Sequence, residues 1–108
     1  MNSTIFALSS APGRAGVAVI RISGESAGAV LSALTGMALP VPRLATRARL
    51  RCPEDGGILD DGLVLWFPAP RSFTGEDVVE LQVHGGSAVI SAILDSLARF
   101  PGLEMAEP

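Results

Sequence analysis

Residues 78–84 alternate between two kinds of side chain, and this alternation constrains the fold more than any other feature of the chain. The apolar positions are Val79, Leu81 and Val83. The intervening positions are Val78, Glu80, Gln82 and His84. A period of two is typical of a β-strand with one face in a core and the other carrying polar groups. A loop rich in Ser, Thr and Gly precedes this strand, and Gly85-Gly86 ends it.

Four other segments have the composition of strands. They are residues 4–10, 16–23, 44–52 and 63–67. Residues 16–23 are apolar almost throughout, which predicts a central strand covered on both faces. Residues 44–52 alternate arginine with Ala48 and Leu50, which predicts an edge strand protected by its charge. The alternative is that this basic face binds an anionic ligand or RNA. We expect Asp60-Asp61 to form a bend.

Two segments show the periodicity of helices. The first has a stripe at Ala27, Val30, Leu31 and Leu34, with Ser23 as a candidate N-cap and Gly36 as the expected end. The second runs from Ser87 to about Phe100 and stops at Pro101-Gly102. We therefore predict an α+β fold in a single domain, residues 1–108. It is a two-layer sandwich of about five strands in a mixed sheet with two to three helices.

Composition excludes several classes of protein. The net charge of −3 argues against a stand-alone nucleic-acid binder. All eight basic residues are arginines, so the chain has neither a P-loop lysine nor a lysine for Schiff-base chemistry. Cys52 is the only cysteine, which excludes an intrachain disulfide and a cysteine-based zinc site. No apolar run approaches the ~20 residues of a membrane span, so we expect a soluble cytoplasmic protein.

Two charged residues are candidates for ligand binding. Glu80 projects from the polar side of its strand and could accept two parallel N–H bonds from a planar donor pair. A solvent-facing glutamate is the simpler interpretation. Arg21 lies inside the apolar run 16–23, where a guanidinium is costly to bury unless it is paired. A salt bridge within the protein, with Glu80 as one possible partner, explains Arg21 as well as a ligand does.

The single histidine, His84, invites a catalytic interpretation. No second histidine can complete a metal site, and the spacing supports no Ser-His-Asp or Cys-His set. Its position before Gly85-Gly86 favours a role in shaping that turn. Glu76-Asp77 are likewise more typical of a solvated turn than of a metal site. These residues predict an α+β domain with a polar, ligand-facing strand, and nothing in them requires catalysis by this chain alone.

Two long motifs carry a family resemblance. The first spans residues 4–24 and ends in Ile20-Arg21-Ile22-Ser23-Gly24, and the second spans residues 65–86 and contains Gly75-Glu76-Asp77-Val78-Val79-Glu80. Leu59-Asp60, Pro101-Gly102-Leu103 and Glu107-Pro108 add shorter matches. In this order the motifs resemble the start of the MnmE (TrmE) tRNA-modification GTPases. The resemblance covers essentially the whole chain.

This resemblance implies an N-terminal domain similar to the tetrahydrofolate-binding domains of aminomethyltransferases. Such a domain binds 5-formyl- or 5,10-methylene-tetrahydrofolate and forms a constitutive homodimer. By the same resemblance, Arg21 would contact the folate and Glu80 would bind its pterin. The full protein works with MnmG, a flavin- and NADH-dependent partner. Together they modify carbon 5 of the wobble uridine (U34) of certain tRNAs with an aminomethyl or carboxymethylaminomethyl group.

The family continues from a Glu-Pro like Glu107-Pro108 into helical and GTPase domains, which are absent from this chain. GTP hydrolysis and potassium binding would belong to that GTPase domain, and the lack of lysine here agrees. We therefore expect a folate-binding, dimer-forming domain that is not catalytic alone. The alternative is a purely structural dimerisation module without folate affinity in isolation.

Overall fold

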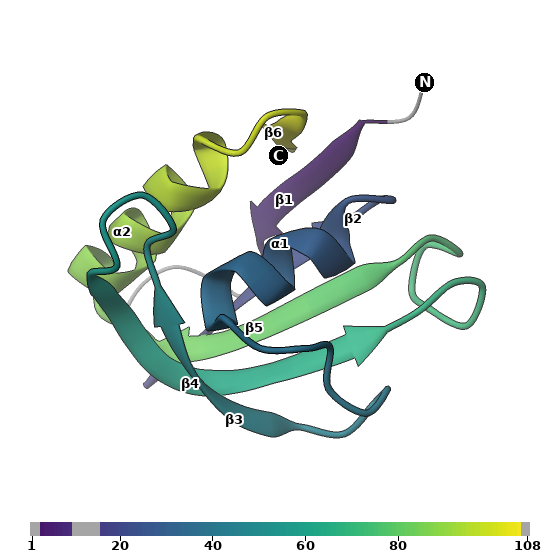
Figure 1. Ribbon diagram of the computed structural model, residues 1–108, viewed down its shortest axis with the longest axis horizontal. Helices are drawn as coiled ribbons and strands as arrows, with labels where there is room; N and C mark the ends of the chain where they lie inside the picture. Colours follow the sequence, from purple (N-terminus) through teal and green to yellow (C-terminus); the bar gives the residue numbers. More distant parts are fainter. Residues whose placement is uncertain (1–2, 10–15, 107–108) are drawn as a thin grey trace.

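A computed structural model describes residues 3–9 and 16–106, which form one sheet of six strands with two helices (Figure 1). The elements in chain order are β1 (Thr4–Leu8), β2 (Val17–Ser23), α1 (Ala27–Thr35), β3 (Thr46–Arg51), β4 (Ile58–Phe67), β5 (Val78–His84), α2 (Ser87–Ala98) and β6 (Leu103–Met105). This arrangement confirms the predicted α+β class. The predicted loop at residues 11–16 falls almost entirely outside the described residues.

The strands lie in the order β3-β4-β5-β2-β1-β6. All neighbours are antiparallel except β1 and β6, which are parallel, so the sheet is mixed as predicted. The described residues hold six strands where about five were expected. The additional strand, β6, has only three residues, too few to show a periodic pattern. Its pairing with β1 is what defines it as a strand.

The hydrophobic core lies between both helices and one face of the sheet. In the middle of the sheet Ile20 pairs with Leu81, and both side chains are fully buried. Leu34 of α1 and Ile93 of α2 are also fully buried and belong to the same cluster. Both helices therefore cover the same face, as the two-layer prediction requires, and α1 crosses in front of the sheet in Figure 1.

We call the opposite side of the sheet the open face. It carries Val17, Val19 and Arg21 of β2, Leu63 and Leu65 of β4, and Glu80, Gln82 and His84 of β5. The prediction that residues 16–23 are covered on both faces is wrong, since Val17 is 54% exposed. An apolar run does not by itself show that both faces are covered, because much of a protein surface is apolar.

The predicted bend at Asp60-Asp61 is also wrong, because both residues lie inside the continuous strand β4. Both carboxylates have hydrogen-bonding partners on neighbouring strands. Asp60 accepts hydrogen bonds from His84, and Asp61 accepts one from Arg49 Nε at 3.1 Å. Two adjacent acidic residues are typical of a bend. Here each of them instead pairs with a residue on a neighbouring strand.

The remaining predictions concern the sheet edge and the helix ends. β3 lies at one edge of the sheet and its arginines are exposed, as expected. Gly36 ends α1 in the left-handed conformation with φ +70°, but the N-cap is Ser26 and not Ser23. Neither helix in the described part of the chain has the length and apolar character that crossing a bilayer requires.

Candidate functional site

The register between β2 and β5 places Arg21 directly opposite Glu80 on the open face. Arg21 Nε donates a hydrogen bond to Glu80 Oε1 at 3.1 Å. The Glu80 side chain is only 10% exposed, whereas the Arg21 side chain is 42% exposed. The structure therefore brings the two predicted site residues together, and the pair prevents Glu80 from being a buried, unpaired charge.

Gln82 fixes the other oxygen of the same carboxylate. Its Nε2 donates to Glu80 Oε2 at 2.8 Å. A carboxylate has about four acceptor positions, and these described donors occupy one on each oxygen. Each oxygen of Glu80 therefore keeps one acceptor position for a further donor. Two donors held in parallel in one plane fit this arrangement.

An aromatic ring lies beside Arg21, the arginine that pairs with this carboxylate. The guanidinium carbon of Arg21 is 4.4 Å from the centre of the Phe73 ring, which is a cation–π contact. Phe67 meets the same ring edge-on, with ring centres 5.2 Å apart. Phe73 is nevertheless 61% exposed, so its ring is accessible from solvent. A hydrogen-bonding carboxylate and an accessible aromatic ring therefore adjoin the same arginine.

The loop that carries Phe73 is attached to the sheet by several hydrogen bonds. Thr74 and Ser23 share a hydroxyl–hydroxyl bond of 2.8 Å. Asp77 Oδ1 accepts the backbone N–H of Ala69 at 2.8 Å, and the carbonyl of Asp77 accepts the N–H of Gly24 at 2.9 Å. Asp77 thus has a structural role within the loop. No group of acidic, cysteine and histidine side chains in the described residues could hold a metal ion.

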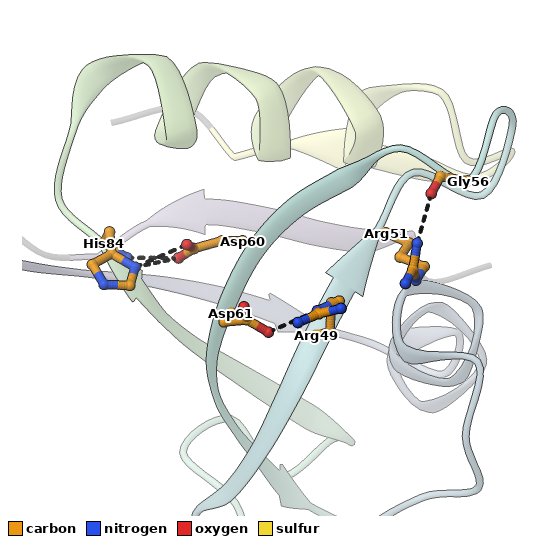
Figure 2. Close-up of polar contacts among 6 residues, drawn as sticks. All are labelled: Arg49, Arg51, Gly56, Asp60, Asp61 and His84. Atoms are coloured by element: carbon orange, nitrogen blue, oxygen red, sulfur yellow. Dashed lines mark hydrogen bonds and ion pairs between the residues drawn. The ribbon is translucent and has the colours of Figure 1, made fainter.

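The structure does not bring His84 to the Arg21–Glu80 pair. His84 lies four residues along β5 from Glu80, which corresponds to ~13 Å at the usual rise of a strand. Asp60 of β4 holds His84 instead, as Figure 2 shows. The same figure shows Arg49 bound to Asp61 and Arg51 bound to the carbonyl of Gly56. Two of the three β3 arginines thus have partners inside the protein, which favours the edge-strand interpretation.

Sequence reasoning named Arg21 and Glu80 as candidates but did not name Phe73 and Gln82, which contact these two residues in the structure. A signal for Gln82 was present, because a residue two positions from Glu80 on the same strand projects from the same face. Phe73 had a weaker signal, a lone aromatic residue in a Ser, Thr and Gly-rich loop. Its contact with Arg21 depends on how that loop folds back over the sheet.

Comparison with known proteins identifies the family. The family described as "GTP-binding protein TrmE N-terminus" matches residues 4–108. The chain is 62% identical over 108 residues to a tRNA modification GTPase MnmE of Paramagnetospirillum magneticum, covering all of this chain and 24% of that protein. It is 58% identical over 105 residues to the MnmE of Parvibaculum lavamentivorans, covering 97% of this chain and 24% of that protein. The chain belongs to the TrmE N-terminal family and spans about a quarter of the length of these relatives.

Proposed function

We propose that this chain binds a one-carbon derivative of tetrahydrofolate, 5-formyl- or 5,10-methylene-tetrahydrofolate, on its open face. The observation that carries the proposal is the Glu80 carboxylate, oriented by Arg21 and Gln82 and retaining acceptor capacity on both oxygens. A pterin presents a ring N–H and an amino group side by side. This donor pair matches the geometry of one carboxylate.

Arg21 and Phe73 supply two further contacts in the proposed complex. The two terminal nitrogens of Arg21 make no hydrogen bond to any other described residue, so they can donate to a ring carbonyl or carboxylate of the ligand. The ring of Phe73 can stack on a flat heterocycle. A planar ligand with a donor edge satisfies the carboxylate and the aromatic ring together.

The direct test varies the ligand. Calorimetric titration of the chain with 5-formyl-tetrahydrofolate should show saturable binding. The analogue without the 2-amino group should bind about 10-fold to 100-fold more weakly, because one charge-assisted hydrogen bond is lost. Equal affinity for both ligands would show that Glu80 does not bind the pterin. If neither ligand binds, the proposal is wrong.

Replacement of Phe73 by leucine should weaken binding of 5-formyl-tetrahydrofolate about 5-fold, since aromatic pairs contribute about 0.5–1.5 kcal/mol beyond area burial. Phe73→Tyr, which keeps the ring, should bind as wild type does. Phe73 is exposed, so thermal unfolding should change little in either variant. Equal weakening in the leucine and tyrosine variants would show that stacking is not the cause.

A second function, homodimerisation, has its own supporting observation. Four large apolar side chains are exposed within eight residues between α1 and β3, namely Met37, Leu39, Val41 and Leu44. Contiguous exposed apolar patches mark interaction surfaces. We propose that a second copy of the chain covers this segment, which adjoins the exposed edge strand β3. A dimer that bound no folate would support the structural-module alternative.

Val41→Asp should therefore shift the chain toward monomer, raising the dimer dissociation constant at least about 10-fold, because binding would bury an unpaired charge. Sedimentation velocity at several protein concentrations measures this shift. Ile58→Asp is a matched control, since Ile58 is 57% exposed but lies on β4 outside this segment. A wild-type chain that stays monomeric at all concentrations would contradict the dimer proposal.

We infer the wider role from family membership. In this proposal the chain acts as a domain, residues 1–108, related in fold to the tetrahydrofolate-binding domains of aminomethyltransferases. It supplies folate for the modification of U34 in tRNA, in the cytoplasm, together with an MnmG-type flavoprotein. GTP and potassium would bind to a GTPase domain outside this chain. Complementation of a strain lacking the relative's N-terminal domain tests this role, and failure of a folate-binding chimera to restore the modified uridine would contradict it.

A further inference from the structure

Half of the chain's basic residues are concentrated in one short segment. Residues 43–51 contain four of the eight arginines, and all eleven acidic residues lie outside this segment. Three of these arginines, Arg47, Arg49 and Arg51, alternate with buried residues on the edge strand β3 and are exposed. We call these three residues the arginine strip. In a chain whose net charge is −3, the strip is a local reversal of charge, which is typical of a surface that binds anions.

The contacts of the arginine strip within the protein leave most of its N–H donors unused. Arg49 donates through Nε to Asp61, and Arg51 donates through Nη1 to the carbonyl of Gly56, each at 3.1 Å (Figure 2). The Arg47 side chain makes no hydrogen bond or ion pair with another described residue. A guanidinium has five N–H donors, so all three arginines can still bind a ligand. Ligand binding is compatible with protection of the sheet edge, which requires only the charge.

A surface cavity of about 410 Å³ lies beside the arginine strip. Its walls include all three arginines, together with Thr35 at the end of α1 and Asp61 of β4. The cavity has room for more than one phosphate group. Alternate residues of a strand lie ~7 Å apart, a spacing close to that of successive phosphates along an extended nucleic-acid strand. The strip therefore fits a chain of phosphates better than a single small anion.

We propose that the arginine strip binds the phosphodiester backbone of single-stranded RNA. The planar guanidinium of arginine donates two parallel N–H bonds to a phosphate. Contacts with phosphates position a nucleic acid without reading its sequence, so the strip orients the RNA and does not select the base. Three such contacts give weak, salt-dependent binding, in agreement with a net charge that argues against a stand-alone nucleic-acid binder. The choice of RNA among polyanions rests on the proposed role in tRNA modification.

Fluorescence anisotropy of a labelled, short single-stranded RNA tests the proposal, with no folate present and at several salt concentrations. A plot of log K against log salt should have a slope of about −2, because each of three contacts in a single strand contributes about −0.7. Arg47→Gln should weaken binding about 10-fold and reduce the steepness of the slope by about 0.7, since one charged contact is lost. Arg47→Lys, which keeps the charge, should retain the wild-type slope.

Arg99→Gln is the matched control, because it removes the same charge from an exposed arginine at the end of α2. RNA affinity and slope should stay at their wild-type values in this variant. Equal losses in Arg47→Gln and Arg99→Gln would show that RNA responds only to the net charge, which overturns the proposal. The proposal is also wrong if the wild-type chain binds no RNA at low salt. Because Arg47 has no partner in the described chain, Arg47→Gln should unfold at the wild-type temperature, so that lost binding does not reflect lost folding.

Inorganic tripolyphosphate, used as a competitor, distinguishes an extended backbone from a compact anion. It should displace the labelled RNA only at a much higher concentration than unlabelled RNA does, because Arg47 and Arg51 are ~13 Å apart along β3 and a compact anion reaches fewer of the arginines. Displacement at the same concentration would identify a polyphosphate site and contradict the proposal. The titration contains no folate, so a chain that binds folate but not RNA loses only this inference, and a chain that binds RNA but not folate loses only the proposed folate function.

Discussion

Glu80→Gln is expected to weaken binding of 5-formyl-tetrahydrofolate about 100-fold, because hydrogen bonds to a charged group contribute about 1.5–3 kcal/mol each and the proposed pterin makes two. The carboxamide keeps the shape of the side chain but turns one acceptor into a donor. The new amide N–H₂ would face one of the two present donors, Gln82 Nε2 or Arg21 Nε. It would also face a donor of the incoming pterin. The loss therefore comes from mismatched hydrogen bonds and not from a changed cavity.

Glu54→Gln makes the same chemical change at an exposed position, where the side chain is 60% exposed and pairs with Arg99. It should leave folate affinity unchanged. Calorimetry on the two variants, with circular dichroism to confirm folding, gives the comparison. The Glu80 variant should remain folded, because its partner Arg21 is 42% exposed and retains access to water. Wild-type affinity in the Glu80 variant would contradict the proposal that this carboxylate binds the ligand.

Gly62→Ala should lower the free energy of unfolding by about 3 kcal/mol, the upper part of the usual range for overpacking. A Cβ at this position would lie 2.4 Å from the backbone carbonyl oxygen of Gln82. Atoms of a neighbouring strand's backbone cannot move aside as a flexible side chain does. The substitution therefore has to separate β4 from β5 at the point where Gln82 supports Glu80.

Gly16→Ala is the matched control for this substitution, because no atom of the described residues lies within 4 Å of a Cβ added there. Urea denaturation followed by circular dichroism measures both variants, and Gly16→Ala should unfold close to the wild-type midpoint. We also expect the Gly62 variant to bind folate less well, since the shifted strand displaces Gln82. A Gly62 variant as stable as wild type would show that β4 and β5 do not approach as closely as the structure places them.

The parts of the fold that a local pattern specifies were predictable from the sequence. The alternation in residues 78–84 placed Glu80 on the polar face and Leu81 in the core, and both placements are confirmed. Leu34 and Ile93 followed from helical spacing in the same way. Each of these assignments depends only on neighbours along the chain, so the sequence pattern is enough to predict it.

The features that reasoning missed depend on residues far apart in the sequence. β6 exists through its pairing with β1, nearly a hundred residues away, and three residues carry no periodicity. Asp60 lies in a strand and accepts hydrogen bonds from His84, which is on another strand. The contact between Arg21 and Phe73 requires the loop to fold over the sheet. Sequence spacing contains none of this information.

The most direct test of the central claim, that folate binds on the open face around Glu80, is a nitrogen-15 NMR titration of the chain with 5-formyl-tetrahydrofolate. The largest shifts should appear at the side-chain Nε–H of Arg21 and the side-chain amide of Gln82, with smaller shifts at the backbone N–H of Phe73. This readout detects even weak binding. Shifts absent from these groups, or confined to α2 and the β3 edge while the ligand saturates the protein, would contradict the claim.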